Sequence, residues 1–318
     1  MARRSTSGLS CLIAIDKPQG LTSHDVVGRV RRILGERRVG HAGTLDPLAT
    51  GVLVVGVGQA TRLMGLLTLD DKRYVARIAF GAETDTDDAE GSVTRTADVP
   101  ARLGEDAVAA AVVASLVGEC DQQPPAYSAV SVDGRRAYTR ARAGEQVELP
   151  TRHVTIHEAS LMGIESRDPL VWECAFHVSK GTYIRSIARD LGRSMGTAAH
   201  LVGLRRGAAG PIGEDVCTTL ERLEELGSEG VSELVLDPTA ALRLPTHELS
   251  DYERDALAVG RRFGCRTVTA ADGSERTPRE GERVSLVRDG RLMGVWEYRE
   301  GRLRSVATFP DGVMGVCR

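Results

Sequence analysis

Apolar residues near the start of the chain follow first a strand period and then a helical one. The run at 12–15 predicts a buried strand, and apolar positions from Val26 to Leu34 then recur at helical spacing. Ser23 is the expected N-cap of this helix and Gly35 its expected stop. The same analysis predicts further strands over 52–57, 74–80 and 171–178 and a helix over 105–117.

A second amphipathic helix is predicted after Tyr183. Arginines recur every four residues along one of its faces, and apolar residues share the opposite face: Arg185, Arg189 and Arg193 against Ile184, Ile187, Ala188 and Leu191. We therefore expect the apolar face to pack in the core and the other face to be cationic.

The last quarter of the chain has a different pattern. Pro238 and Pro245 punctuate a boundary, and short apolar runs joined by tight turns follow over 284–287, 292–296 and 303–309. We predict a disordered N-terminus over 1–10, one large domain over 11–244 and a small β-rich domain over 245–318.

Composition narrows the function classes. The chain has 318 residues, 42% hydrophobic and 27% charged, with a formal net charge of −3, all ordinary for a soluble globular protein. The first apolar run is too short for a signal peptide or a membrane span, so a cytoplasmic protein is expected. Six scattered cysteines without a CxxC pair favour free thiols over disulfides or zinc.

Two familiar ligand motifs are absent from the sequence. The string at 56–61 (GVGQAT) lacks the third glycine of a dinucleotide fingerprint and the GK[ST] of a phosphate loop. The acidic turn at 84–91 has Glu90 where a calcium loop requires glycine. We therefore expect neither a nucleotide cofactor nor a metal.

The segment 40–51 (GHAGTLDPLATG) is the strongest candidate for chemistry. Glycines surround it, and Pro47 stiffens the backbone directly after Asp46. Apolar neighbours on both sides can partly desolvate the Asp46 carboxylate, which is one way to tune such a group. The alternative is a tight surface turn in which the aspartate caps the local backbone.

Other residues extend this candidate site. His41 lies in the same segment, Tyr74 and Tyr183 follow basic or glycine-rich stretches, and Arg185 opens a helix. The set favours carboxylate nucleophilic or acid–base chemistry on an anionic, nucleic-acid substrate. A glycosidase with Asp88 as second carboxylate stays open, and each residue alone has a purely structural interpretation.

Taken together, the motifs resemble one family. Those that carry the resemblance are 16–20 (DKPQG), 40–51, 72–74 (KRY), 81–91, 127–129 (YSA) and 179–185 (SKGTYIR). In this order they resemble the bacterial tRNA pseudouridine synthase B family, from about Leu12 to about Leu244. The resemblance implies an α+β pseudouridine synthase fold: a mixed, largely antiparallel sheet flanked by helices, followed by a small PUA-like RNA-binding domain.

The resemblance also implies a reaction and its catalytic residues. Uridine 55 in the T-loop of tRNA would be isomerised to pseudouridine without a cofactor, after the base is flipped out of the RNA stack. Asp46 matches the essential aspartate, Arg185 the arginine that pairs with it, and Asp88 a carboxylate that holds the arginine. Tyr74 matches the tyrosine that stacks on the flipped base. Whether Asp46 attacks the ring, attacks the sugar or removes a sugar proton stays open.

Four more positions match substrate-binding residues of the family. His41 corresponds to the histidine that contacts the reorganised T-loop, Tyr183 and Leu204 line the uracil pocket, and Lys17 falls in a motif that is both structural and RNA-facing. The expected partner is the T-arm of tRNA, and the expected state is a monomer. The alternative from another class is a T-loop binding or tRNA-folding protein whose catalysis is secondary.

Overall fold

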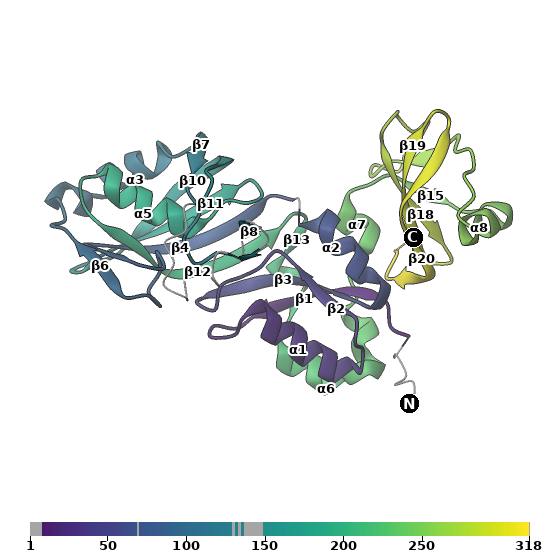
Figure 1. The fold of residues 1–318 in the computed structure, drawn as a ribbon, viewed down its shortest axis with the longest axis horizontal. Coiled ribbons are helices and arrows are strands. Elements are labelled where there is room, and N and C mark those ends of the chain that lie inside the picture. The colour runs from purple at the N-terminus through teal and green to yellow at the C-terminus, as the bar shows by residue number, and fades with distance from the viewer. Residues whose placement is uncertain (1–7, 69, 129–130, 133–134, 137–148, 318) are drawn as a thin grey trace. The chain divides into compact units, whose positions relative to one another are not determined.

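The computed structural model describes residues 8–317, except 69, 129–130, 133–134 and 137–148 (Figure 1). The chain forms two compact units. The first comprises Met1–Asp46, Gly51–Leu69 and Ala209–Arg318, and the second comprises Pro47–Thr50 and Asp70–Ala208. Of the N-terminus predicted to be disordered over 1–10, residues 1–7 fall outside the described residues, whereas Ser10 is buried and its hydroxyl accepts from the Gln59 N–H at 3.0 Å.

The N-terminal sheet of the first unit is built around β3 (Ala49–Val57). This strand pairs antiparallel with β1 (Cys11–Lys17) and with β2 (Val39–Ala42), and β14 (Cys217–Thr218) joins β1 in parallel. Nearly all of β1 and β3 is buried, as their continuous apolar runs predict. The strands predicted at 12–15 and 52–57 are confirmed.

Helices cover both faces of this sheet. On one side α1 (Ser23–Leu34) and α6 (Leu220–Gly230) lie side by side (Figure 1). On the other, apolar residues of the sheet pack with α2 (Met64–Leu67), α7 (Pro238–Leu242) and buried residues of the C-terminal strands. The short connecting elements of this unit are η1 (Gly58–Leu63), β13 (Ile212–Gly213), η3 (Glu214–Val216) and η4 (Val231–Leu234).

The predicted span of α1 is confirmed, but its cap is one residue earlier than expected. Thr22 is the N-cap, and its side chain and that of Asp25 form a reciprocal capping box. Gly35 ends the helix with φ 61°, a left-handed conformation that glycine adopts without a Cβ clash. Ser23 therefore has its side chain free for another contact, described below.

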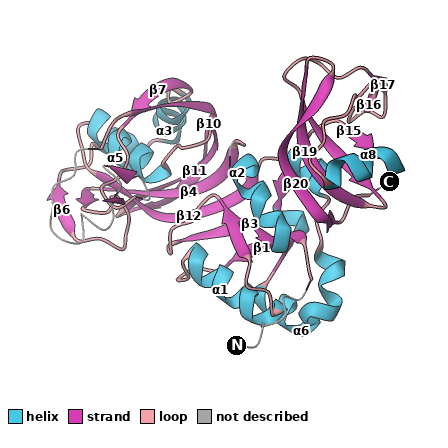
Figure 2. Cartoon of the chain, turned by 45° about the vertical axis from the view of Figure 1, so that its right-hand side comes forward, coloured by secondary structure: helices cyan, strands magenta, loops and turns pink. Residues whose placement is uncertain are grey.

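The C-terminal part of the first unit is a six-stranded sheet in the order β17-β16-β15-β18-β19-β20. The strands over 283–314 confirm the predicted β module. The short strands that precede them, and a helix beside the sheet, were not predicted. The strands are β15 (Thr246–Glu248), β16 (Val268–Thr269), β17 (Glu275–Arg276), β18 (Arg283–Arg288), β19 (Arg291–Arg299) and β20 (Arg302–Met314). The helix α8 (Asp251–Ala258) lies beside the sheet (Figure 2). Trp296 of β19 is fully buried in a hydrophobic cluster that includes residues of α8.

The second unit is built on the strand order β12-β4-β11-β10-β7. These strands are β4 (Lys72–Phe80), β7 (Gly118–Gln122), β10 (Arg152–Arg167), β11 (Leu170–Val178) and β12 (Ala199–Ala209). The strands predicted at 74–80 and 171–178 are confirmed, whereas β10 and β12 were not predicted. Four short strands form separate pairs: β5 (Ala82–Thr84) with β6 (Val93–Thr96), and β8 (Ser131–Val132) with β9 (Arg135–Arg136).

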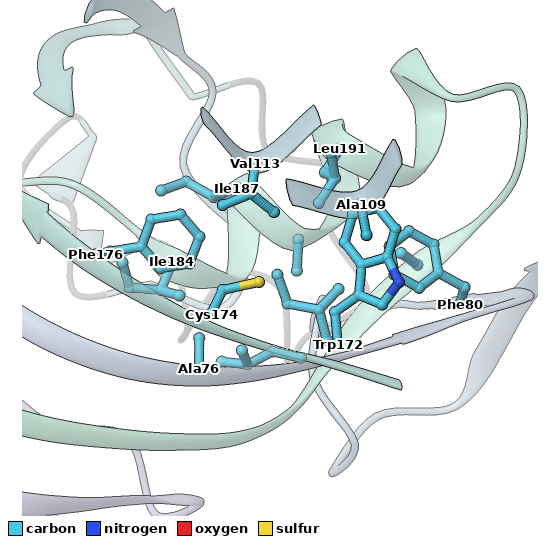
Figure 3. Packing of buried hydrophobic residues seen from close by; sticks show 14 of the residues in the cluster. Ala76, Phe80, Ala109, Val113, Trp172, Cys174, Phe176, Ile184, Ile187 and Leu191 are labelled. Carbon is cyan, nitrogen blue, oxygen red and sulfur yellow. The ribbon is translucent and has the colours of Figure 1, made fainter. Parts of the chain in front are cut away.

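Two helices pack on one face of this sheet. Apolar residues of α3 (Asp106–Ala114) and α5 (Ile184–Ser194) meet the strands around Trp172 and Cys174 (Figure 3). The Trp172 indole N–H donates to the carbonyl of Leu103, which lies in η2 (Ala101–Gly104). The polar atom of this buried tryptophan therefore has a hydrogen-bond partner in the core. Both predicted helices are confirmed.

The α+β class is confirmed, because both units combine sheets with packed helices. The predicted limits of a catalytic domain at 11–244 and a small domain at 245–318 stay a prediction. Among the described residues, none of the helices is long and apolar enough to cross a membrane.

Candidate active site

The loop that carries Asp46 runs from Gly43 to Leu48, between β2 and β3. Its first half is tied to the start of α1. The Ser23 hydroxyl donates to the Leu45 carbonyl at 3.0 Å and accepts from the Leu45 N–H at 2.8 Å. Both residues are buried, with 1% and 3% of their surface exposed. Ser23, predicted as a helix cap, instead fixes the backbone one residue before Asp46.

The second half of the loop is anchored in a different core. Asp46 is the last residue of the first unit, and 47–50 belong to the second. Leu48 is buried in the hydrophobic cluster of the second unit, and the Thr50 hydroxyl donates to the Leu204 carbonyl at 3.5 Å. The partly exposed Asp46 thus lies between two buried leucines, which agrees with the stiff loop expected from Pro47.

His41 and Lys17 also belong to the first unit. His41 is on β2, opposite Val55 of β3, and is partly exposed. Lys17 ends β1 and is fully buried, and its ammonium donates to the carbonyls of Pro18 and Leu21 at 2.9 and 2.6 Å. Lys17 therefore stabilises the turn that leads into α1.

Arg185 lies in the first turn of α5, in the second unit, and is buried. Its Nη1 donates to the Thr86 carbonyl at 2.9 Å and lies 3.4 Å from the Asp88 carboxylate. Its Nη2 donates to the Tyr127 carbonyl at 3.0 Å. The structure thus brings together the predicted pair Arg185 and Asp88, although the two are almost 100 residues apart in the sequence.

The acidic turn holds Asp88 in a defined orientation. One carboxylate oxygen of Asp88 accepts from the Thr86 hydroxyl at 2.6 Å and the Glu90 N–H at 3.0 Å, and the other faces Arg185. Backbone hydrogen bonds join Asp87 and Ala89 to Leu201 of β12. Within the described part of the chain, no group of three or more His, Cys, Asp or Glu side chains is arranged to hold a metal ion.

The prediction of a cationic helix face is wrong. Arg185 and Arg189 are buried, with 5% and 8% of their surface exposed. Arg189 pairs with Asp87 at 2.7 Å, and Arg193 pairs with Glu83 at 2.6 Å. The helical period identifies residues that share a face, but a distant acidic segment covers Arg185 and Arg189 and pairs with all three arginines, while the Arg193 side chain stays 55% exposed.

Tyr74 and Leu204 lie at the border of the hydrophobic cluster of the second unit. Tyr74 is on β4, opposite Phe176 of β11, and Leu204 is on β12, the strand next to β4. Both are partly buried and pack against the cluster, so each leaves part of its side chain exposed. This suits residues that contact a planar ligand.

Tyr183 is held by a residue that the sequence did not identify. The buried Gln122 side chain accepts from the Tyr183 N–H at 2.8 Å and donates to the Tyr183 carbonyl at 3.0 Å. The two bonds fix the backbone at the start of α5, directly before Arg185. Gln122 ends β7 in a polar stretch with no periodicity, so only its place in the fold reveals this role.

A buried lysine precedes Tyr74 on the same strand. Burial and the nearby Arg206 guanidinium lower the pKa of the Lys72 ammonium to about 8. Lys72 and Tyr74 are two residues apart on β4 and therefore project from the same side of the sheet. A modest rise of pH above neutral therefore removes part of the positive charge of Lys72 on this side of the sheet.

Two family models match the chain. The model for the N-terminal domain of TruB family pseudouridylate synthases matches residues 31–184. The model for the C-terminal domain of tRNA pseudouridylate synthase B matches residues 185–241. Together they include every predicted site residue except Lys17.

Many curated proteins are similar over most of their length. A protein named tRNA pseudouridine synthase B from Arthrobacter sp. (strain FB24) is 42% identical over 304 residues, which is 95% of this chain and 97% of that protein. Proteins of the same name from Thermobifida fusca (strain YX) and Nocardia farcinica (strain IFM 10152) are 44% and 46% identical, over 94% and 81% of this chain and 98% and 83% of theirs.

Solved structures share the fold. An H/ACA RNP bound to a substrate RNA containing 2'-deoxyuridine contains a chain that matches with a TM-score of 0.69 at 23% identity, covering 95% of this chain and 85% of that one. A Cbf5-Nop10-Gar1 complex matches with a TM-score of 0.68 at 25% identity, covering 95% and 84%. With the family models, these similarities confirm the predicted fold.

Proposed function

The chain belongs to the TruB family of pseudouridylate synthases, and from this premise we propose how its residues convert uridine 55 of tRNA to pseudouridine. The protein is an isomerase that forms pseudouridine in tRNA, because it matches the family model and is similar to curated tRNA pseudouridine synthases over most of its length. The observation that carries the residue assignment is the anchored Asp46 loop, because a carboxylate held on both sides and still partly exposed can meet a substrate in one orientation.

The reaction needs no redox partner, since the atoms of the uridine are only rearranged. The N1–C1' bond breaks, the uracil turns, a C5–C1' bond forms, and the C5 proton leaves while N1 gains one. We assign Asp46 the role of nucleophile or base that starts this sequence. Its ionised form is the reactive one, so a cation beside the substrate favours catalysis.

Arg185 is the cation that we assign to Asp46. Two carbonyls and one carboxylate hold its guanidinium, and the Asp88 contact of 3.4 Å is longer than a short ion pair. A guanidinium has five N–H donors, so Arg185 can bind a second anion in addition to these partners. Asp88 is then a positioning residue, which acts through Arg185.

The uracil must leave the RNA stack before this chemistry. We propose that Tyr74 stacks on the flipped base and that Tyr183 and Leu204 line its pocket, which fits their partial burial at the border of the core. Stacking on an aromatic side chain contributes roughly 1–3 kcal/mol, which offsets much of the cost of flipping. His41 then contacts the T-loop where the base has left, and Lys17 supports the neighbouring turn.

We propose that the T-arm is the part of tRNA that is bound, that the protein acts as a monomer in the cytoplasm, and that residues 245–318 form a PUA-like RNA-binding domain. The arginines on the long C-terminal strands, such as Arg291 and Arg302, are exposed and suit phosphate contacts.

The test uses an unmodified tRNA transcript with tritium at uridine C5, since pseudouridine and uridine have equal mass. We expect the protein to release tritium from one T-loop uridine, and Asp46→Asn to abolish release while tRNA binding stays within about threefold, because the substitution removes only a charge. Tight binding without release by the wild type would favour the binding or folding role. Free uracil in the supernatant would favour a glycosidase.

A further inference from the structure

Two consecutive aspartates of the acidic turn hold two arginines that lie one helical turn apart. Asp88 faces Arg185 at 3.4 Å, and Asp87 accepts from Arg189 at 2.7 Å. Asp87 has φ 60°, a left-handed conformation that aspartate tolerates better than most residues. All four side chains are at least nine-tenths buried.

Arg189 is committed to the protein rather than to a substrate. Its Nη1 donates to Asp87 at 2.7 Å, its Nη2 to the Gln123 carbonyl at 3.0 Å and its Nε to Asp190 at 2.8 Å. The Gln123 carbonyl also accepts from the Ser186 hydroxyl at 2.8 Å. Arg189 therefore joins α5 both to the acidic turn and to the segment after β7.

Asp87 is a competitor for the cation that Asp88 holds. Its burial raises the pKa of the Asp87 carboxyl, while first Arg189 and then Arg185 act against that rise. Without Arg189, the cation that acts most strongly on Asp87 is Arg185, and Arg193 acts more weakly. A buried carboxylate without a partner is costly, so the turn would shift to bring Asp87 closer to Arg185.

We propose that Arg189 is a positioning residue for pseudouridine formation: by holding Asp87, it ensures that Asp88, and not Asp87, is the carboxylate of the acidic turn that orients Arg185. This inference rests on the proposed role of Arg185. It does not require Arg189 to touch the RNA.

The test compares Arg189→Gln, Asp87→Asn and the double variant in single-turnover tritium release. We expect Arg189→Gln to lose at least about tenfold in rate, with the Kd for tRNA within about twofold, because the change acts on chemistry and not on the RNA surface. The double variant removes the competing charge as well, so its rate should return to within about threefold of wild type. The rates are compared at a temperature where each variant is folded, because a purely structural role would leave the rate of folded Arg189→Gln at the wild-type value.

Arg193→Gln is the matched control. It removes the same charge from the same helix one turn further on, but its partner Glu83 keeps a second arginine, Arg95, at 2.6 Å. We expect its rate to stay within about twofold of wild type, since no buried carboxylate loses its last partner.

Three results would overturn the inference: Arg189→Gln at the wild-type rate, a double variant as slow as Arg189→Gln, or an equal loss in Arg193→Gln. If Arg189→Gln does not fold, the double variant decides, because it buries no unpaired charge. Its recovery to within threefold supports the inference, and a loss above tenfold overturns it. An inactive wild type would instead overturn the proposed function and, with it, this inference.

Discussion

The Asp46 loop and the Arg185 assembly are restrained by different forces. The loop is held by neutral hydrogen bonds from Ser23 to Leu45 and by the apolar burial of Leu48. Arg185 is held by charge, with a buried carboxylate on one side and two carbonyls on the other. Neutral hydrogen bonds contribute about 1 kcal/mol each, whereas breaking a buried ion pair costs about 3–5 kcal/mol. The two regions should therefore respond very differently to substitution.

The largest effect is expected from Arg185→Ala. It leaves the Asp88 carboxylate buried without its cation, so we expect the free energy of unfolding to fall by about 3–5 kcal/mol. The single-turnover rate should fall by about 10³-fold or more, because the charge that we assign to Asp46 is lost. Affinity for tRNA should stay within about threefold, since the buried Arg185 guanidinium contacts Asp88, Thr86 and Tyr127 of the protein.

Arg77→Ala is the control for this variant. Its guanidinium pairs with Glu165 but is about half exposed, so the expected loss of stability is below about 1 kcal/mol. Weak tRNA binding by Arg185→Ala together with a normal single-turnover rate would contradict the charge-based interpretation of this region.

A smaller effect is expected from Ser23→Ala, which tests the neutral restraint. The Leu45 N–H and carbonyl lose their buried partner, which costs about 1–3 kcal/mol. Because Asp46 directly follows Leu45, we also expect the single-turnover rate to fall by about tenfold. Rates and melting temperatures would be measured together.

Thr22→Ala separates positioning from stability, because it changes the adjacent residue. It removes the N-cap and the capping box of α1, which lowers stability by about 0.5–2 kcal/mol. The catalytic rate of this variant should be normal at a temperature where it is folded. If Thr22→Ala slows the reaction as much as Ser23→Ala does, the Ser23 contact has no specific role.

The same contrast explains what the sequence could predict. The signals for the Asp46 loop are local, with glycines, a proline and apolar neighbours within twelve residues, so its stiffness was predictable. The cap of α1 was misplaced because Ser23 is by type at least as good an N-cap as Thr22, which is the cap in the structure. The inward turn of Ser23 depends on Leu45, 22 residues later.

Long-range packing explains what was missed. Periodicity shows that Arg185 and Arg189 share a face, but the turn that covers it comes about 100 residues earlier. Strand β10 has three register irregularities along its pairing with β11, which break the alternation that would have predicted it. Strand β12 contains Gly203 and the arginines 205 and 206, and only the fold shows that Arg206 is buried.

The smallest expected effect concerns a charged restraint outside both regions, around His247 of the C-terminal sheet. Its ring contacts the Thr267 carbonyl at 2.9 Å and the Glu253 carboxylate at 3.1 Å. The Cys265 side chain, the Thr267 carbonyl and Glu253 together raise the pKa of His247 from 6.5 to about 9. Both ring nitrogens thus face acceptors, which favours the doubly protonated imidazolium.

The direction of the pH effect follows from this shift. The folded protein binds the proton more tightly than the unfolded chain, so the stabilisation is complete below about pH 6.5 and is lost as the pH rises through about 9. The partly screened site should contribute about 1–2 kcal/mol. Melting temperatures at pH 7 and pH 10 should therefore differ less in His247→Gln than in the wild type, whereas His153→Gln, which alters an exposed histidine, should behave like the wild type.

The single-turnover rate of His247→Gln at pH 7 should be unchanged, because the contacts of His247 with Thr267 and Glu253 restrain neither Asp46 nor Arg185. An altered rate would mean that catalysis depends on the C-terminal sheet, and the contrast between neutral and charged restraints would then be incomplete.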